Sequence, residues 1–180
     1  MRYKLLLALL LISSSRSVTY YSQTDPRWAD IPLTCADGET ARFSSRGCGE
    51  TVVAMLMSTY VDPKYTPDVT LDEFYGRGYC HGTSLTQNVE ILKSNGFDVR
   101  SPSISLLTLK NYIRAGWMAW IHVEYGSSGH EALIVKMNNR NEFVVYDPYF
   151  GIGAISDKFF YDENNIVEFY IIKQEPNDTF

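Results

Sequence analysis

Cys48 is the residue of this sequence best suited to act as a nucleophile. It lies between two glycines, directly before residues 51–57, which are apolar nearly all round and predict a buried helix. The N–H groups and partial positive charge at a helix N-terminus favour a thiolate over a thiol, and they can stabilise an oxyanion beside the sulfur. The glycines allow unusual backbone angles and leave the sulfur approachable. A small buried residue, or half of a disulfide, is the alternative interpretation of Cys48.

His130 is the candidate base for such a nucleophile, because histidine takes up and releases protons near neutral pH. It opens a segment rich in β-branched residues directly after Ser127-Ser128-Gly129, which places it at a predicted sheet edge. His122 lies inside an apolar-rich strand, which favours a structural role. His81 lies in a Gly-rich loop, where nothing fixes its position.

Asp147 is the candidate partner of His130. If residues 130–137 and 142–147 form a hairpin around Asn139, His130 lies nine residues before the turn centre and Asp147 eight after it. The two are then neighbours at the open end of the hairpin, within the distance at which cross-strand side chains interact. A carboxylate there can fix the tautomer of the imidazole. Asp147 also precedes Pro148, so the start of a turn is a second interpretation, and both can hold.

Gln23 is the fourth candidate. It lies in a loop with aromatic neighbours, Tyr21 and Trp28, upstream of Cys48. A glutamine amide can donate to a developing oxyanion without itself titrating.

The order of predicted elements indicates an α+β domain, with helices first and an antiparallel sheet after them. The helix after Cys48 is expected to end at Asp62-Pro63. A capping box at Ser84 opens a second helix that Asn95-Gly96 closes, and Gly116 follows a third. The predicted helices begin near residues 51, 84 and 106, and the predicted strands span 117–125, 131–137, 143–146 and 166–172.

Length and composition predict one globular domain, residues 18–180, after a signal peptide, residues 1–17. The chain has 180 residues, is 45% hydrophobic and carries a net charge of −5. Without residues 1–17 the charge is −8, and no Lys/Arg cluster is present, so a nucleic-acid partner is not expected.

Residues 1–17 have the three parts of a secretory signal. Arg2 and Lys4 precede the apolar run 5–12, and small polar residues follow it. The run is shorter than the roughly 20 residues that span a bilayer, so no membrane span is expected in the mature chain. We therefore expect a secreted or periplasmic protein. In an oxidising compartment Cys35 and Cys80 are a plausible disulfide that leaves Cys48 free, although three cysteines allow three pairings.

No cofactor and no metal are expected. The sequence has no paired-ligand spacing for a metal and no Gly-rich nucleotide motif. A metal hydrolase using Cys48, His81 or His130 is a minor alternative.

Taken together, these segments resemble the C39-like branch of the papain-like cysteine peptidases over about residues 20–172. Each motif is short, but four occur in the family's order. They are Tyr20-Tyr21-Ser22-Gln23 with Trp28, Gly47-Cys48-Gly49-Glu50-Thr51 with Ala54-Met55, Gly129-His130-Glu131-Ala132-Leu133-Ile134-Val135, and Val145-Tyr146-Asp147-Pro148.

The resemblance implies a papain-like fold in which N-terminal helices pack on a C-terminal antiparallel sheet. It implies Cys48 as nucleophile, His130 as general base and acid, Asp147 as its orienting partner and Gln23 as an oxyanion donor. Glu50 departs from the family, which often has proline there, and a carboxylate so close can raise the pKa of the thiol. Glu131 is also unusually polar, although strand alternation points it to the other face from His130.

These observations favour a secreted cysteine peptidase that hydrolyses peptide or cell-wall peptide amide bonds. Some family members are attached to an ATP-driven transporter, which is not expected here. Removal of a leader peptide coupled to export, the role of those members, is therefore not expected of this chain. The alternative is a non-catalytic peptide- or wall-binding module that keeps the fold, including a phage virion or cell-entry component.

Overall fold

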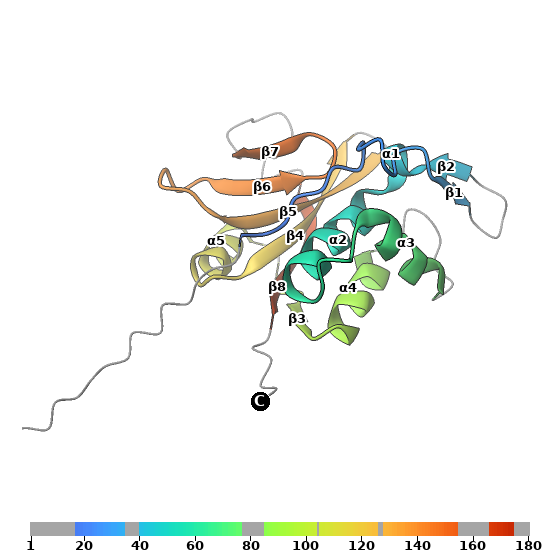
Figure 1. The fold of residues 1–180 in the computed structure, drawn as a ribbon. Helices are drawn as coiled ribbons and strands as arrows, with labels where there is room; N and C mark the ends of the chain where they lie inside the picture. The colour runs from blue at the N-terminus through green and yellow to red at the C-terminus, as the bar shows by residue number, and fades with distance from the viewer. Residues whose placement is uncertain are drawn as a thin grey trace, which may run out of the picture.

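The structure, a computed structural model, describes residues 17–34, 40–76, 85–103, 105–125, 128–154 and 166–174. It is mixed α+β, with most of the helices before the sheet, as expected (Figure 1). The helices are α1 (Phe43–Arg46), α2 (Cys48–Tyr60), α3 (Pro67–Gly76), α4 (Leu85–Ser94) and α5 (Leu106–Arg114). The strands are β1 (Pro32–Thr34), β2 (Thr40–Arg42), β3 (Phe97–Arg100), β4 (Met118–Tyr125), β5 (Ser128–Met137), β6 (Phe143–Asp147), β7 (Gly151–Ala154) and β8 (Ile166–Gln174).

Six strands form one antiparallel sheet in the order β3-β8-β4-β5-β6-β7, and β1 and β2 form a separate hairpin. The long strands β4, β5 and β8 lie next to one another inside the sheet, where each pairs on both sides. This arrangement fixes the register of β5, which carries His130, against β4 and β6 (Figure 1).

Helices cover both faces of the sheet. Trp120 and Leu133 pack in one cluster with residues of α2 and α4. Their neighbours Ile121 and Ala132 point to the other face and pack in a second cluster with α5. Residues 49–58 of α2 are buried, because the helix lies between the sheet and α3 and α4 (Figure 1). Burial on every side explains why this helix is apolar nearly all round.

The three predicted helices are confirmed, and their ends follow local signals. The helix α2 ends shortly before Asp62-Pro63. Ser105 caps α5 by accepting a hydrogen bond from the Thr108 N–H, and Gly96 and Gly116 follow their helices with φ of 83°. The Ser84 cap lies outside the described residues.

The helices α1 and α3 and the strands β1, β2, β3 and β7 were not expected. The helix α1 and the four strands have only three or four residues each, too few for a recognisable pattern, whereas α3 has ten residues but weak apolar periodicity. The start of β5 also differs from expectation. Ser128 and Gly129 pair with β4, so His130 is the third residue of its strand and not the first.

Two predictions fall outside the described ranges. Residues 1–16 of the signal, and both Cys35 and Cys80, are not among the described residues. Among the helices of the described ranges, none is both long enough and apolar enough to cross a membrane.

Candidate active site

Cys48 is the first residue of α2; it forms no disulfide, and the residue is half-buried. The carbonyl of Gly47 accepts the Thr51 backbone N–H at 3.0 Å and the Thr51 hydroxyl at 2.6 Å. These bonds begin the first turn of α2 at Gly47 and fix the backbone on which Cys48 lies.

Close packing, and not unusual backbone angles, explains the glycines beside Cys48. Gly47 has φ of −87°, and Gly49 is not among the described residues with positive φ. A Cβ atom at Gly47 would lie 2.7 Å from the Phe43 ring. A Cβ atom at Gly49 would lie 2.7 Å from both Glu131 Oε2 and Asn88 Nδ2. The expectation that glycine supplies conformational freedom here is wrong, because neighbouring side chains fill the space.

His130 and Asp147 contact each other at the open end of the β5–β6 hairpin. His130 Nε2 lies 3.0 Å from Asp147 Oδ1 and 3.0 Å from Oδ2. Their side chains are 12% and 3% exposed, so the pair is shielded from water. The strands pair through Met137↔Phe143 and Leu133↔Tyr146, with a register shift between Ile134 and Lys136. The turn is therefore centred at residue 140 and not at Asn139, but the two side chains are neighbours at the open end of the hairpin, as predicted.

The carboxylate of Asp147 also starts a turn. Oδ1 accepts the backbone N–H groups of Tyr149 at 2.7 Å and Phe150 at 2.8 Å. The Phe150 ring then meets the His130 ring edge to face, at 5.9 Å between centroids. Both interpretations of Asp147 therefore hold, since one side chain orients His130 and starts the turn.

Cys48 lies beside the backbone of His130 and Glu131. The backbone N–H groups of Gly49 and Glu131 donate toward the Cys48 sulfur. The N–H of Glu131 belongs to the peptide group that joins it to His130, and α2 packs against β5. The fold therefore brings Cys48 next to the backbone of the strand that carries His130, 82 residues later in the sequence.

Gln23 connects the segment before α2 to the end of β6. Its backbone N–H donates to the Pro148 carbonyl at 2.8 Å, and its side-chain Nε2 donates to the Ser44 carbonyl at 2.9 Å. The side chain is buried, and Oε1 has no hydrogen-bond partner within the described structure. These contacts hold Gln23 next to the turn that begins at Asp147.

The environment of Cys48 favours the neutral thiol. Burial raises the pKa of the thiol well above its ordinary value, and the carboxyl groups of Glu131 and Glu50 raise it further. The N–H groups that donate to the sulfur act in the opposite direction but do not offset burial. The expected effect of the N–H groups on the pKa of the thiol is therefore present but is outweighed by burial, and the expected effect of Glu50 is present as well.

Glu131 is the site residue whose surroundings the sequence did not reveal. Its Oε2 accepts from Trp120 Nε1 at 3.0 Å and from Asn88 Nδ2 at 3.3 Å. Its Oε1 lies 3.8 Å from Nδ1 of His122, the histidine expected to be structural. His122 pairs with Glu131 across the β4–β5 ladder. The contact between the two side chains could therefore have been predicted only if the register of β4 against β5 were known.

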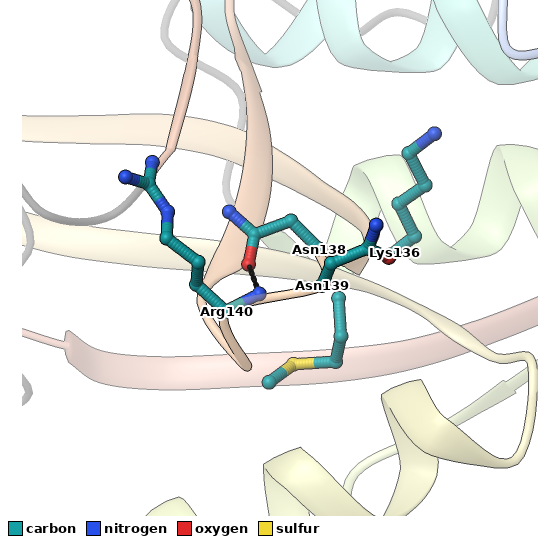
Figure 2. A pocket seen from close by; sticks show the side chains of 5 residues that line it. Lys136, Asn138, Asn139 and Arg140 are labelled. Carbon is teal, nitrogen blue, oxygen red and sulfur yellow. Dashed lines mark hydrogen bonds between the residues drawn. The ribbon is translucent and has the colours of Figure 1, made fainter.

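A surface hollow of about 340 Å³ lies at the other end of the hairpin (Figure 2). Residues 136–140 line it, around the turn where Asn138 Oδ1 accepts the Arg140 N–H. His130 and Asp147 lie at the opposite, open end, so this hollow is not part of the candidate site.

Across the described ranges, no group of three or more His, Cys, Asp or Glu side chains is arranged to hold a metal ion. His81, the third residue of the minor metal hypothesis, lies outside those ranges.

The fold is similar to that of the peptidase domain of Streptococcus ComA, a bi-functional ABC transporter involved in a quorum sensing pathway. The TM-score is 0.58 at 22% identity, over 80% of this chain and 98% of that domain. The chain has the C39-type, papain-like peptidase fold. The resemblance inferred from the four motifs is thus confirmed at the level of the fold.

Two structures of the Streptococcus mutans ComA peptidase domain also match. One, in complex with a small-molecule inhibitor, has a TM-score of 0.48 at 18% identity and covers 78% of this chain. The other has a TM-score of 0.47 at 22% identity and covers 80% of this chain, and each match spans 98% of the ComA domain. No protein-family model matches the sequence, and no curated protein matches it either.

Proposed function

We propose that this protein is a cysteine peptidase with Cys48 as its nucleophile. The sulfur attacks the carbonyl carbon of a peptide bond while His130 takes the thiol proton. The tetrahedral intermediate collapses to an acyl-enzyme when His130 returns that proton to the leaving amine. Water, deprotonated by His130, then releases the acid product and the free thiol. The observation that carries the proposal is the His130–Asp147 pair on a strand whose backbone meets the Cys48 sulfur, in a peptidase fold.

Asp147 acts through His130. Its oxygens lie against Nε2, so the neutral ring carries its proton there and Nδ1 is the nitrogen that faces the chemistry. The carboxylate then stabilises the imidazolium that forms when Nδ1 takes the thiol proton.

Gln23 supplies a donor for the oxyanion. One N–H of its side-chain amide is engaged by the Ser44 carbonyl, and the amide has a second. The backbone N–H groups at the start of α2 are further donors. This assignment rests on the burial of Gln23 beside the end of β6.

We extend the proposal to a peptide substrate outside the cytoplasm, either a protein loop or the peptide stem of a cell wall. Its support is the signal-like segment 1–17 and the acidic net charge of the remaining chain. Export is tested separately, by the N-terminal sequence of the protein recovered from the producing cell.

The test is hydrolysis of fluorescent casein and of cell-wall stem peptides by the purified chain. Cys48→Ala and His130→Ala are each expected to lower the rate by at least about 10⁴-fold, because nucleophile and base act as a unit. Iodoacetamide is expected to label Cys48 and to block hydrolysis. Full activity in the Cys48→Ala variant would contradict the proposal.

A non-catalytic peptide-binding module is the second candidate, and one observation favours it. The Cys48 thiol is held neutral by burial and by two carboxyl groups, which weakens a nucleophile. Binding of the same peptides without hydrolysis, equally by the protein and by Cys48→Ala, would support this alternative.

A further inference from the structure

Two aromatic side chains next to His130 are exposed to solvent, and the proposed reaction uses neither. Tyr149 and Phe150, in the turn between β6 and β7, are each 53% exposed. Single exposed apolar side chains are ordinary on a protein surface. These two, however, are consecutive, and their rings meet at 4.9 Å between centroids. They form one apolar surface, which we call the aromatic patch.

Phe150 joins the aromatic patch to the candidate site. Its ring lies edge to face against the His130 ring, at 5.9 Å between centroids and 77° between planes. The side chain of His130 is only 12% exposed, whereas more than half of the Phe150 side chain remains open to solvent. The patch therefore offers apolar surface directly beside the proposed base.

The turn holds the aromatic patch in place through its backbone. Asp147 Oδ1 accepts the backbone N–H groups of Tyr149 and Phe150, at 2.7 and 2.8 Å. The carbonyl of Pro148 accepts the Gln23 backbone N–H at 2.8 Å. A surface that is fixed in this way loses little conformational freedom when a ligand binds, which favours affinity.

The proposed reaction determines which part of a substrate reaches the patch. His130 returns its proton to the leaving amine, so the amine nitrogen lies within hydrogen-bond distance of the imidazole. The Cα atom bonded to that nitrogen bears the side chain of the first residue after the scissile bond. The acyl half is bonded instead to the Cys48 sulfur, with its oxygen toward Gln23 and the start of α2. The leaving half therefore lies on the His130 side of the site, beside the aromatic patch.

The chemistry of the patch favours an apolar side chain. Residues 148–154 contain no charged side chain, and Ile152, 56% exposed, adds apolar surface on β7. An apolar side chain that covers the two rings removes apolar area of both partners from water. A charged side chain gives up water contacts there without gaining an ionic partner from this segment.

We infer that Tyr149 and Phe150 form a binding subsite for an apolar side chain on the residue that follows the scissile bond. The inference rests on the proposed function and adds a specificity to it. Among the peptide bonds that fit the site, those followed by leucine, phenylalanine or a similar residue are cleaved fastest. Phe150 contacts both the base and the bound side chain, and Tyr149 extends the surface that this side chain covers.

The test compares peptides that differ only in the residue after a cleaved bond. A casein or cell-wall stem peptide that spans a bond hydrolysed by the protein is synthesised with leucine, phenylalanine, serine or aspartate directly after that bond. The peptides compete in one reaction, and mass spectrometry gives the ratios of their kcat/KM values. The parent protein is expected to cleave the leucine and phenylalanine peptides about tenfold faster than the other two.

Substitutions in the patch should weaken this preference. Tyr149→Ser is expected to lower it by about threefold, and Phe150→Ser to lower it further, whereas Phe150→Leu keeps an apolar side chain and should retain most of it. Because Phe150 contacts His130, its variants can lose overall rate, but the ratio between competing peptides is independent of that loss. Val61→Ser is the matched control and should leave the preference unchanged. Val61 is an exposed apolar side chain that follows α2, at the opposite end of the helix from Cys48.

Equal kcat/KM values for the four peptides would overturn the inference, and so would an apolar preference that Tyr149→Ser and Phe150→Ser both leave unchanged. Gel filtration detects a second copy of the chain on the patch. A dimer that Tyr149→Ser disrupts without changing the peptide preference also overturns the inference. Hydrolysis without any preference removes only this inference, whereas the absence of Cys48-dependent hydrolysis of casein and stem peptides removes the proposed function as well.

Discussion

The carboxylate of Asp147 contacts the His130 ring and also accepts the backbone N–H groups of the turn that follows it. One substitution can separate its role in orienting His130 from its role in the turn. Asp147→Asn keeps an oxygen that can accept from Tyr149 and Phe150. Its amide N–H, however, donates to His130 Nε2, so the ring proton moves to Nδ1, which then cannot accept the thiol proton. We expect kcat to fall by about 10²- to 10⁴-fold with little change in stability.

The matched control for this substitution is Asp98→Asn. Asp98 lies on β3 and pairs with Arg100, at the far edge of the sheet from β6. The Asp98→Asn variant should therefore hydrolyse peptides at the same rate as the parent protein. Peptide hydrolysis and urea unfolding of both variants are the measurements. Equal kcat values for Asp147→Asn and the parent protein would remove Asp147 from the proposed mechanism.

His130 and Asp147 were predictable because they lie 17 residues apart on one hairpin, where strand register and turn position fix the distance. The surroundings of Glu131 were not. Its contact with Gly49 joins strand β5 to a helix 82 residues earlier, and no local pattern encodes that approach. Burial, which raises the pKa of the Cys48 thiol, likewise depends on the whole tertiary structure.

At the scale of elements, α2 and β5 meet so closely that only glycine fits at position 49. Gly49→Ala would place its methyl group 2.7 Å from Glu131 Oε2 and Asn88 Nδ2. Both are far ends of side chains, but they are buried and hydrogen-bonded, so movement disrupts their contacts. We expect a loss of about 1–3 kcal/mol in the free energy of unfolding, measured in urea.

Gly153→Ala is the control for this helix–strand contact. No atom lies within 4 Å of the position of a Cβ at Gly153, and its φ is not positive. The same substitution in an uncrowded strand is expected to change stability by less than about 0.5 kcal/mol. Equal effects at the two positions would show that close packing against Glu131 is not what requires glycine at position 49.

Elements with clear sequence signals were predictable, whereas the shortest strands and the ten-residue helix α3 were not. The helices α2, α4 and α5 have sequence signals at their ends, such as Gly96 and Gly116, that mark where each stops. The strands β3 and β7 have four residues each, and β7 contains two glycines. These two strands form because the adjacent strands, β8 and β6, offer free backbone hydrogen-bonding groups at the edges of the sheet. Their formation therefore depends on tertiary structure and not on local sequence.

At the scale of the whole molecule, the fold is similar to that of the ComA peptidase domain, and the core of this chain contains two buried acids, Glu50 and Glu131. A shared fold does not fix the chemistry of a site. A carboxyl pair inside the core must affect global stability as well as the local thiol, because its protonation changes on unfolding. The pH dependence of stability is therefore an independent measure of the same feature.

Stability is expected to fall as pH rises from about 5 to 8. The pKa of Glu50 is about 8 in the folded protein, raised from 4.5 by burial, so the folded state binds more protons than the unfolded state across that window. The cost at pH 8 is on the order of 4 kcal/mol for Glu50. Glu131, whose pKa is also raised by burial, adds in the same direction.

Urea unfolding at pH 5, 6.5 and 8 measures this dependence, and Glu50→Gln should flatten most of it because glutamine does not titrate. Glu124→Gln, exposed on β4, should keep the slope of the parent protein. A stability that rises between pH 5 and 8 would mean that Glu50 is ionised and paired in solution. In that case Glu50 is negatively charged near Cys48 at neutral pH, which raises the pKa of the thiol.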